Sequence, residues 1–241
     1  MRPIRRGASP QQEDFSQYED AKPELVSRLG PYCSYCERKI PTLLAVEHIQ
    51  PKGLRRYKHL AGRWENFLLA CTNCNATKRD KDVDPGLFYL PDRDNTFVNF
   101  VYASDGSLRP VAGTTEEIAA RTLALTGLDQ PVASILDFNG QLVALDRVSQ
   151  RMQAWEQAAE SKIGLAGQPT NDILRREIAK FAKAEGFFSI WMTVFADDTD
   201  MRHRLIDAFP GTRDSGCFDP ITAAPVSPAP NHDALPNGGK I

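Results

Sequence analysis

The stretch Cys33-Ser-Tyr-Cys36 and its counterpart Cys71-Thr-Asn-Cys74 decide how this chain folds. Each is a pair of cysteines with two residues between them, and 34 residues separate the two pairs. Such spacing lets both sulfur atoms face one centre about 2.3 Å away, as in a tetrahedral zinc site. One pair alone would also fit a redox motif, or cysteines packed without a ligand, but two pairs favour zinc. Four thiolates leave no open coordination position, so the expected Zn²⁺ is structural and serves folding.

A short aliphatic run between the two pairs ends in a Glu-His pair. Residues 43–46 predict a strand, and Glu47 and His48 follow it directly. Because successive side chains of a strand point to opposite faces, one of these residues can hold a metal ion while the other faces a substrate. The second cysteine pair opens a predicted short helix, on which Asn75 and Lys78 share one face.

The order of these residues resembles the HNH endonuclease family. The resemblance lies in Cys-x-x-Cys, then Glu-His-Ile-x-Pro-Lys, then Trp-x-Asn-x-Leu-Leu-x-Cys-x-x-Cys-Asn-x-x-Lys, and covers about a fifth of the chain, residues 33–78. It is specific because spacing, residue type and order all agree. It implies an α+β fold class with a ββα-metal (HNH) nuclease core, in which a hairpin and a helix clamp one divalent ion beside the four-cysteine zinc site.

The resemblance also implies roles for individual residues. His48 matches the general base that takes a proton from the attacking water, and Glu47 matches the metal-binding acidic position. Asn75 matches the third motif position, and these two oxygen ligands favour Mg²⁺ or Mn²⁺ at the catalytic site. Asn66 matches the middle asparagine, which usually hydrogen-bonds backbone to hold the base in place. The candidate phosphate contacts are Lys52, Arg55, Arg56 and Lys78.

Each of these residues also has a plainer interpretation when it is taken alone. A histidine after a glutamate at a strand end is more often structural than catalytic, and an asparagine after a zinc cysteine is often a helix or turn residue. Their arrival together, in the order of the family, favours functional use.

The flanks of the motif resemble a narrower group, the PtuB-type nucleases, which are the HNH subunits of Septu and related retron anti-phage systems. The similar stretches are residues 1–7, 30–38, 91–95, 209–212 and 217–219. This resemblance implies a PtuA-like ABC/OLD-type ATPase as partner, and a retron RNA/DNA complex as a further one. The chain has no G-x-x-x-x-G-K-[ST], so ATP hydrolysis would belong to another subunit.

The charge of the chain is small but unevenly distributed. The formal net charge is −2, yet residues 1–80 hold 14 basic and nine acidic residues. Residues 38–63 hold seven basic residues and one acidic residue. A local basic zone on a nearly neutral protein suggests a small polyanion site, with a solvated basic loop as the alternative.

The composition is that of an ordinary soluble globular protein. The chain has 241 residues, of which 41% are hydrophobic and 25% charged. Its basic start leads into polar residues, and its longest apolar run is too short to span a bilayer. We therefore expect a cytoplasmic protein with reduced thiols and no contact with a membrane, in which Cys217 is a buried or idle thiol.

The rest of the chain predicts four regions. We expect an N-terminal helical, partner-docking segment at 1–30, the nuclease domain with its zinc site and a following hairpin at 31–112, a mostly helical C-terminal region at 113–219, and a disordered tail at 220–241. The tail is predicted because it holds five prolines and no aromatic residue.

Patterns within these regions predict individual elements. The predicted elements are a helix before Gly30, a hairpin at 97–111 turning at Asp105-Gly106, a helix from a capping box at 114–117 to Gly127, and helices at 141–160 and 170–185. The last should begin at Thr170 or Asn171 and turn Ile173, Ile178 and Phe181 inward. The aromatic stretch 187–195 is expected in the core rather than on a docking face.

Two functions from different classes remain. The first is a metal-dependent HNH endonuclease that hydrolyses nucleic-acid phosphodiester bonds, with DNA favoured and RNA or tRNA the alternative, as effector of an anti-phage defence complex. The second is a non-catalytic zinc-ribbon subunit that only binds nucleic acid. A restriction or homing enzyme acting alone is less favoured, because no sequence-reading module is recognisable.

Overall fold

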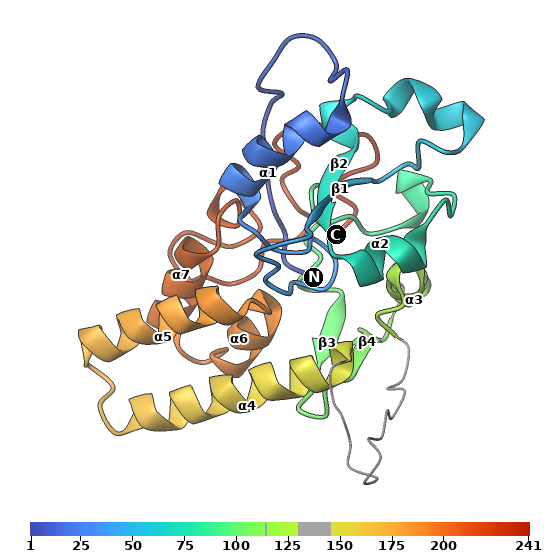
Figure 1. The fold of residues 1–241 in the computed structure, drawn as a ribbon. Helices are drawn as coiled ribbons and strands as arrows, with labels where there is room; N and C mark the ends of the chain where they lie inside the picture. The colour runs from blue at the N-terminus through green and yellow to red at the C-terminus, as the bar shows by residue number, and fades with distance from the viewer. Residues whose placement is uncertain (114, 130–145) are drawn as a thin grey trace, which may run out of the picture.

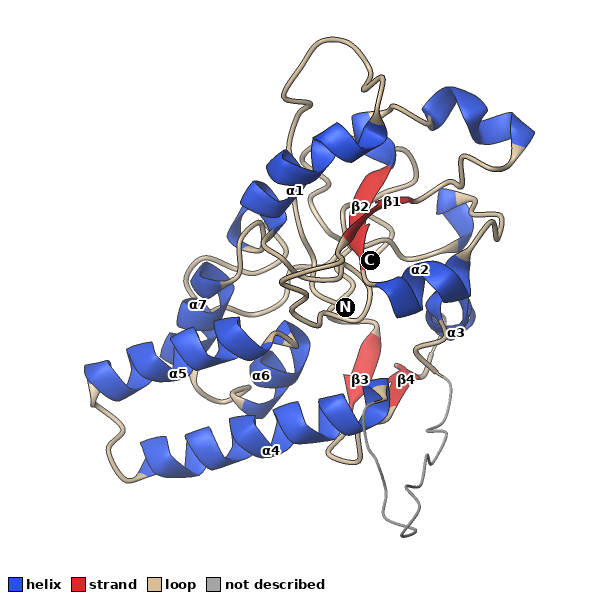
Figure 2. Ribbon diagram, viewed as in Figure 1, coloured by secondary structure: helices blue, strands red, loops and turns tan. Residues whose placement is uncertain are grey.

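The described part of the chain forms a mixed α/β structure of two small sheets and many helices joined by long loops (Figures 1 and 2). The computed structural model describes residues 1–113, 115–129 and 146–241. Within these ranges, no helix has both the length and the apolar character needed to cross a membrane.

A hairpin followed by a helix forms the centre of the molecule. Strand β1 (Ala45–His48) pairs antiparallel with β2 (Phe67–Ala70), and α2 (Thr72–Lys78) begins directly after β2. This is the ββα order that the sequence predicts. The first strand begins two residues later than the aliphatic run indicates, so Glu47 and His48 lie inside it. The strand has these limits because its pairing with β2 begins at Ala45 and includes Glu47 opposite Leu68 and His48 opposite Phe67.

The segment before the hairpin contains a short 3₁₀ helix, η1 (Tyr18–Ala21), which leads into α1 (Lys22–Leu29). Helix α1 buries Leu25 and Leu29, and it ends at Gly30, whose φ of 73° is readily adopted by glycine. The predicted helix before Gly30 is therefore confirmed.

The region after the nuclease motif starts with a second hairpin. Strands β3 (Phe100–Tyr102) and β4 (Leu108–Pro110) pair antiparallel, as predicted. Helix α3 (Glu116–Thr126) follows and ends at Gly127 in the left-handed conformation, which confirms its predicted end. Thr114, where the predicted capping box begins, lies outside the described residues.

Four helices form a layer of their own beside the nuclease core (Figure 1). They are α4 (Arg147–Ala166), α5 (Asp172–Glu185), α6 (Phe188–Val194) and α7 (Thr199–Ala208). Helix α4 packs on α6, and α5 packs on α7. Asn171 caps α5 by accepting a hydrogen bond from the Leu174 N–H, and residues 141–145 of the predicted preceding helix lie outside the described residues.

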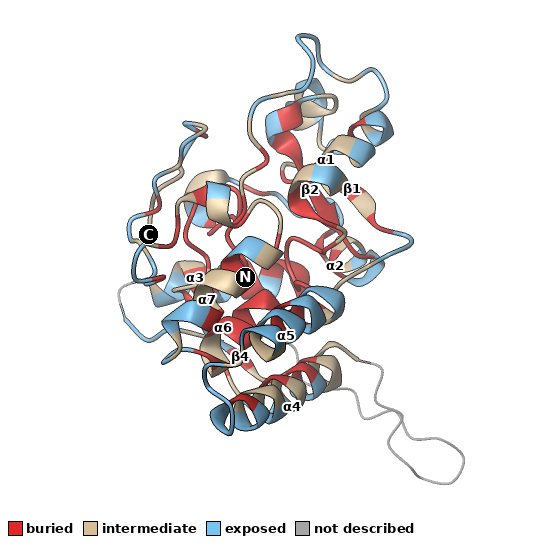
Figure 3. Cartoon of the chain, turned by 90° about the vertical axis from the view of Figure 1, so that its left-hand side faces the viewer, coloured by how far each residue is buried: buried red, intermediate tan, exposed pale blue. Residues whose placement is uncertain are grey.

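The burial of this helical layer corrects one prediction and confirms another. Ile178 of α5 is buried, but Ile173 is 65% exposed and Phe181 is 39% exposed, so the prediction that all three point inward is wrong. Only a narrow stripe of α5 is covered by its neighbours, and Ile173 lies in the first turn, beyond that stripe. The aromatic stretch 187–195 belongs to the core, as predicted, and Trp191 is fully buried. Figure 3 shows buried residues along α6.

Glu37, directly after the first cysteine pair, joins the helical layer to the nuclease core. Its side chain is buried and accepts a hydrogen bond of 2.7 Å from the Ser189 N–H of α6. Its other carboxylate oxygen accepts one of 2.8 Å from the Tyr102 hydroxyl, and its backbone carbonyl accepts one from Phe187. One side chain therefore ties the first cysteine loop to both β3 and α6.

The last 22 residues, 220–241, differ from the disordered tail that their composition predicts. Ala223, Ala229 and Leu235 are buried, and Lys240 Nζ lies 2.9 Å from Asp94. The Asn95 side chain donates to the backbone carbonyl of Val226 in this region as well. The prediction of disorder is wrong because it weighs only the segment's own apolar content, whereas the segment is held by buried polar groups of residues 92–95.

Candidate active site

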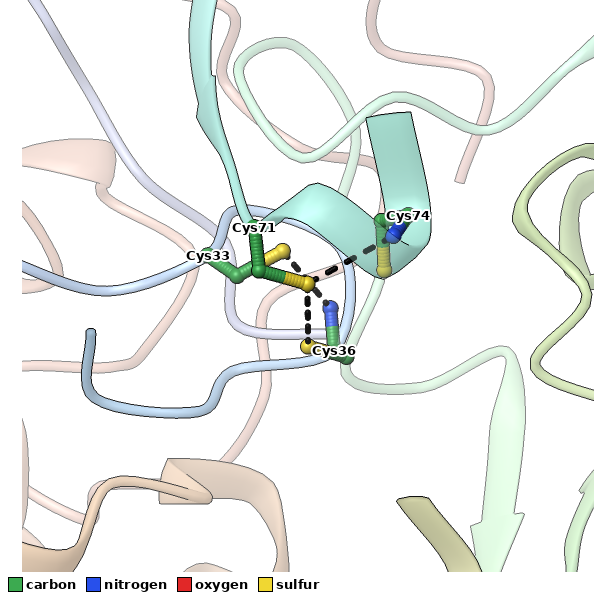
Figure 4. A group of neighbouring side chains, drawn as sticks. All are labelled: Cys33, Cys36, Cys71 and Cys74. Atoms are coloured by element: carbon green, nitrogen blue, oxygen red, sulfur yellow. Dashed lines mark hydrogen bonds between the residues drawn. The ribbon is translucent and has the colours of Figure 1, made fainter. Parts of the chain in front are cut away.

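The four paired cysteines converge on one buried point (Figure 4). Their ligand atoms all lie within 4.8 Å of one another, and the Sγ atoms of Cys36 and Cys71 are 3.7 Å apart. A tetrahedral zinc with bonds of about 2.3 Å requires sulfur atoms about 3.8 Å apart. The donor set and its spacing therefore fit a structural Zn²⁺. All five cysteines are free thiols, and Cys217 is buried away from this group, as expected.

Two arginines approach the sulfur atoms from outside the cysteine loops. Arg38 Nη2 lies 3.2 Å from Cys71 Sγ, and Arg147 Nη1 lies 3.6 Å from Cys74 Sγ. Four thiolates around one Zn²⁺ leave a net negative charge, which guanidinium donors offset. Because Arg147 is the first residue of α4, it also joins the helical layer to the zinc site. No pattern in the sequence indicates this contact.

A second group of predicted residues lines a cavity of about 170 Å³ between β1, the following turn and α2. Five of the predicted site residues, Glu47, His48, Lys52, Asn75 and Lys78, line this cavity. Three others, Asn66, Arg55 and Arg56, do not. The structure therefore brings together the base, the acidic residue and the amide of the motif.

His48 is held so that one ring nitrogen is left free. Its Nε2 lies 2.9 Å from the carbonyl oxygen of Ala61. A carbonyl can only accept a hydrogen bond, so Nε2 carries the proton and Nδ1 keeps its lone pair in the neutral ring. Burial lowers the pKa of His48, the Ala61 hydrogen bond raises it in part, and Lys52 and Lys78 lower it further. The imidazole is therefore neutral near pH 7, as a general base must be.

Glu47 forms a buried ion pair that the sequence did not predict. Lys78 Nζ lies 2.7 Å from Glu47 Oε1 and donates a hydrogen bond of 2.7 Å to the His48 carbonyl. Burial raises the pKa of Glu47, and the lysine partly offsets this. Lys78 was expected as a phosphate contact, but its side chain is 1% exposed and runs from α2 to β1, where it is held by these two partners. In this arrangement it is a counter-charge of Glu47.

The oxygens of Glu47 and Asn75 could hold a hard divalent cation. Glu47 Oε1 is buried and lies 2.7 Å from Lys78 Nζ, so a cation bound there would share this carboxylate with the lysine. The Asn75 side chain is half-buried and lines the same cavity. A buried carboxylate and an amide on one cavity wall are oxygen donors that suit a hard ion, which would take its remaining ligands from water and substrate.

Asn66 lies outside this cavity, next to the loop that follows His48. Its side chain accepts a hydrogen bond from the Gln50 N–H at 2.8 Å and donates to the carbonyls of Gln50 and Leu60. These bonds tie the chain after His48 to the loop before β2. The middle asparagine of the family is expected to hold the general base in place, which requires such contacts. The effect of Asn66 on catalysis stays a prediction.

The basic residues predicted to contact phosphate differ in their surroundings. Lys52 Nζ lies 3.5 Å from the centre of the Tyr18 ring, over its face. Arg56 pairs with Asp82, and both side chains are about half exposed. Arg55 is exposed on the 3₁₀ helix η2 (Arg55–Leu60) beside it. Arg55 and Arg56 are therefore accessible to a polyanion outside the cavity.

Three residues with polar side chains on the cavity wall were missed by the sequence prediction: Tyr18, Arg79 and Asp80. The last two directly follow the Asn-x-x-Lys end of the motif, so extending the motif by two residues would have found them. Tyr18 lies 29 residues before Glu47, and no local pattern in the sequence indicates its place.

Comparison with known proteins agrees with this geometry. Residues 33–81 match the family model described as HNH endonuclease. The chain contains an HNH endonuclease domain. The matched range includes both cysteine pairs, the hairpin and α2, and it ends one residue after Asp80. The search among curated proteins returned no match.

Proposed function

We propose that the HNH domain of this chain is a catalytically active, metal-dependent endonuclease that hydrolyses nucleic-acid phosphodiester bonds. The observation that carries the proposal is the single cavity lined by His48, Glu47 and Asn75, beside which Ala61 holds His48 through Nε2. The domain match supports nuclease activity in general, and the cavity supplies the groups that hydrolysis needs.

His48 is the residue that moves a proton in the proposed reaction. Its Nδ1 takes a proton from a water molecule, which attacks the phosphorus atom as the bond to the 3′-oxygen breaks. Glu47 and Asn75 would hold Mg²⁺ or Mn²⁺, and the bound ion supplies charge stabilisation at the scissile phosphate and the leaving oxygen. The products are a 5′-phosphate and a 3′-hydroxyl.

Cleavage assays test the proposal directly. We expect the zinc-loaded protein to cut plasmid DNA in the presence of Mg²⁺ or Mn²⁺, and to lose that activity when a chelator removes the added ion. Total tRNA is the second substrate to test, because one general base and one hard cation can hydrolyse the phosphodiester backbone of either DNA or RNA. The proposal fails if neither substrate is cut under any of these metal conditions, with or without a co-expressed partner.

A non-catalytic nucleic-acid binder is the second candidate, and the Glu47–Lys78 ion pair is the observation that favours it. Lys78 neutralises the charge of the Glu47 carboxylate without a metal ion. Titration with Mn²⁺ distinguishes the two functions, because a nuclease should bind the ion in the cavity whereas a pure binder should show no binding that depends on Glu47.

We further propose that the chain acts as the HNH subunit of a Septu-like anti-phage complex with a PtuA-like ATPase, with DNA as the favoured substrate. The support is the resemblance of its flanking stretches to PtuB-type nucleases and the lack of a phosphate-binding loop in the sequence. The cleavage assays should therefore be run on the chain alone and on the chain purified with such a partner.

Replacing Arg55 and Arg56 together with glutamine should weaken substrate binding and flatten its salt dependence. Each phosphate contact contributes about 0.9 to the slope of log affinity against log salt on duplex DNA, so loss of two should reduce the slope by about 2. Binding isotherms at several salt concentrations, measured with the catalytic ion left out, give this slope.

A matched double variant is Arg176→Gln with Lys180→Gln on α5. These side chains are also exposed, and like Arg56 they pair with acidic neighbours, but they lie on the helical layer. An unaltered slope in the Arg55/Arg56 variant, or an equal change in the α5 variant, would remove Arg55 and Arg56 from the phosphate path.

A further inference from the structure

The N-terminal segment contributes a wall of the catalytic cavity, although it lies outside the HNH match. Tyr18, in η1, lines the cavity together with His48. The matched range begins at residue 33, so the domain match does not include this wall. Segments that are distant in sequence therefore build the site together.

The ring of His48 contacts two aromatic side chains. Phe67 meets it edge-on with centroids 5.2 Å apart, and Tyr18 meets it at 69° with centroids 4.8 Å apart. One hydrogen bond, from Nε2 to Ala61, leaves an imidazole free to swing about that bond. The two aromatic contacts restrict this motion and so restrict the direction in which Nδ1 points.

The two aromatic residues are not equivalent. Phe67 is fully buried within the hairpin, whereas Tyr18 is half-buried on a separate segment. Lys52 holds Tyr18 in place through its cation–π contact at 3.5 Å. Because Lys52 lies on the turn after His48, the tyrosine is fastened to the strand end that carries the base.

The same segment also supports the hydrogen-bond acceptor of His48. The Phe15 N–H donates a hydrogen bond of 2.9 Å to the Gly62 carbonyl, next to Ala61. A side-chain carbon added at Gly62 would lie 2.3 Å from the Phe15 carbonyl oxygen, so the two backbones are in close contact. Residues 15–18 therefore brace both the imidazole ring and the loop that holds its Nε2.

We infer that Tyr18 is a positioning residue for His48, and that residues 15–21 complete the catalytic site of the HNH domain. The inference rests on the proposed nuclease function for its kinetic part, but the restraint of the His48 ring is a property of the resting protein. The ring of Tyr18 carries this role, and its hydroxyl is not required.

Two substitutions of Tyr18 test the inference in the full-length, zinc-loaded protein. Tyr18→Leu should lower kcat about tenfold and leave KM within about twofold, since it loosens the base without removing a substrate contact. Tyr18→Phe keeps the ring and should retain near wild-type kcat. Phe181→Leu, a half-exposed aromatic on α5, is the matched control and should change neither constant.

NMR of histidine side chains labelled with ¹³C and ¹⁵N provides a readout that does not depend on cleavage. In the wild type and in Tyr18→Phe, the His48 ring should show the Nε2–H tautomer and ring-current-shifted carbon-bound protons. In Tyr18→Leu, these shifts should move toward those of an exposed histidine. His48→Asn assigns the resonances.

The possible outcomes distinguish failure of the Tyr18 inference from failure of the proposed nuclease function. Unmoved His48 resonances in Tyr18→Leu, or an equal loss of kcat in Tyr18→Phe, would overturn the inference. A raised KM with unchanged kcat would also overturn it, because it would make Tyr18 a substrate contact. If the wild type cuts no substrate, the proposed function fails, and the NMR shifts alone decide whether Tyr18 holds the ring.

Discussion

Replacing His48 with alanine should lower the rate of phosphodiester cleavage by about 100- to 10,000-fold, the usual contribution of a general base. The variant keeps the cysteine cluster and the oxygens of Glu47 and Asn75, so it should still bind zinc and the added divalent ion. What it lacks is the free Nδ1 that accepts the proton from water. Single-turnover cleavage of plasmid DNA with Mg²⁺ measures the loss.

His48 is only 7% exposed, so the alanine variant needs a check on its fold. His48→Asn is a second variant, because its amide can still donate a hydrogen bond toward the Ala61 carbonyl but cannot act as a base. Both variants should keep the zinc content and the circular dichroism of the wild type. His203→Ala, a half-buried histidine on α7 that lies outside the cavity, is the matched control. Cleavage at wild-type rates in His48→Asn would refute the assignment of the base.

The parts of the site that the sequence predicts are those in which spacing alone determines geometry. Two residues between cysteines direct both sulfur atoms to one side of a turn, and the observed cluster of four follows from having two such turns. Asn75 and Lys78 share a face of α2 because they are three residues apart. The strand assignment was less accurate, since its limits depend on pairing with β2.

The parts that the sequence does not predict depend on contacts between distant segments. Lys78 looked like a phosphate contact because nothing in the local pattern shows that its side chain reaches back to Glu47 on the neighbouring strand. Tyr18 contacts His48, and Arg147 contacts Cys74, from outside the motif, and neither contact has a periodic signature in the sequence. Residues 220–241 were predicted to be disordered for the same reason, because their partners lie at residues 92–95.

Replacing Cys74 with serine should remove the zinc and unfold the nuclease core, with a loss of more than about 4 kcal/mol in the free energy of unfolding. Cys74 belongs to α2, and its partner Cys71 caps the same helix by accepting the Cys74 N–H. Loss of zinc would leave three buried thiols beside the guanidinium of Arg38 without their central ion. Because α2 also carries Asn75, cleavage should be lost with the metal.

Cys217→Ser provides the matched control for this prediction, since Cys217 is equally buried but has no part in the cluster. Burying a hydroxyl there should cost about 1–3 kcal/mol and leave the zinc content at one per chain. Elemental analysis gives the stoichiometry, and urea unfolding gives the stability of both variants. If Cys74→Ser kept one zinc and unfolded at the same urea concentration as Cys217→Ser, the four cysteines would not form a structural metal site. The order of α2 would then have to come from the packing of Leu69 and its buried neighbours alone.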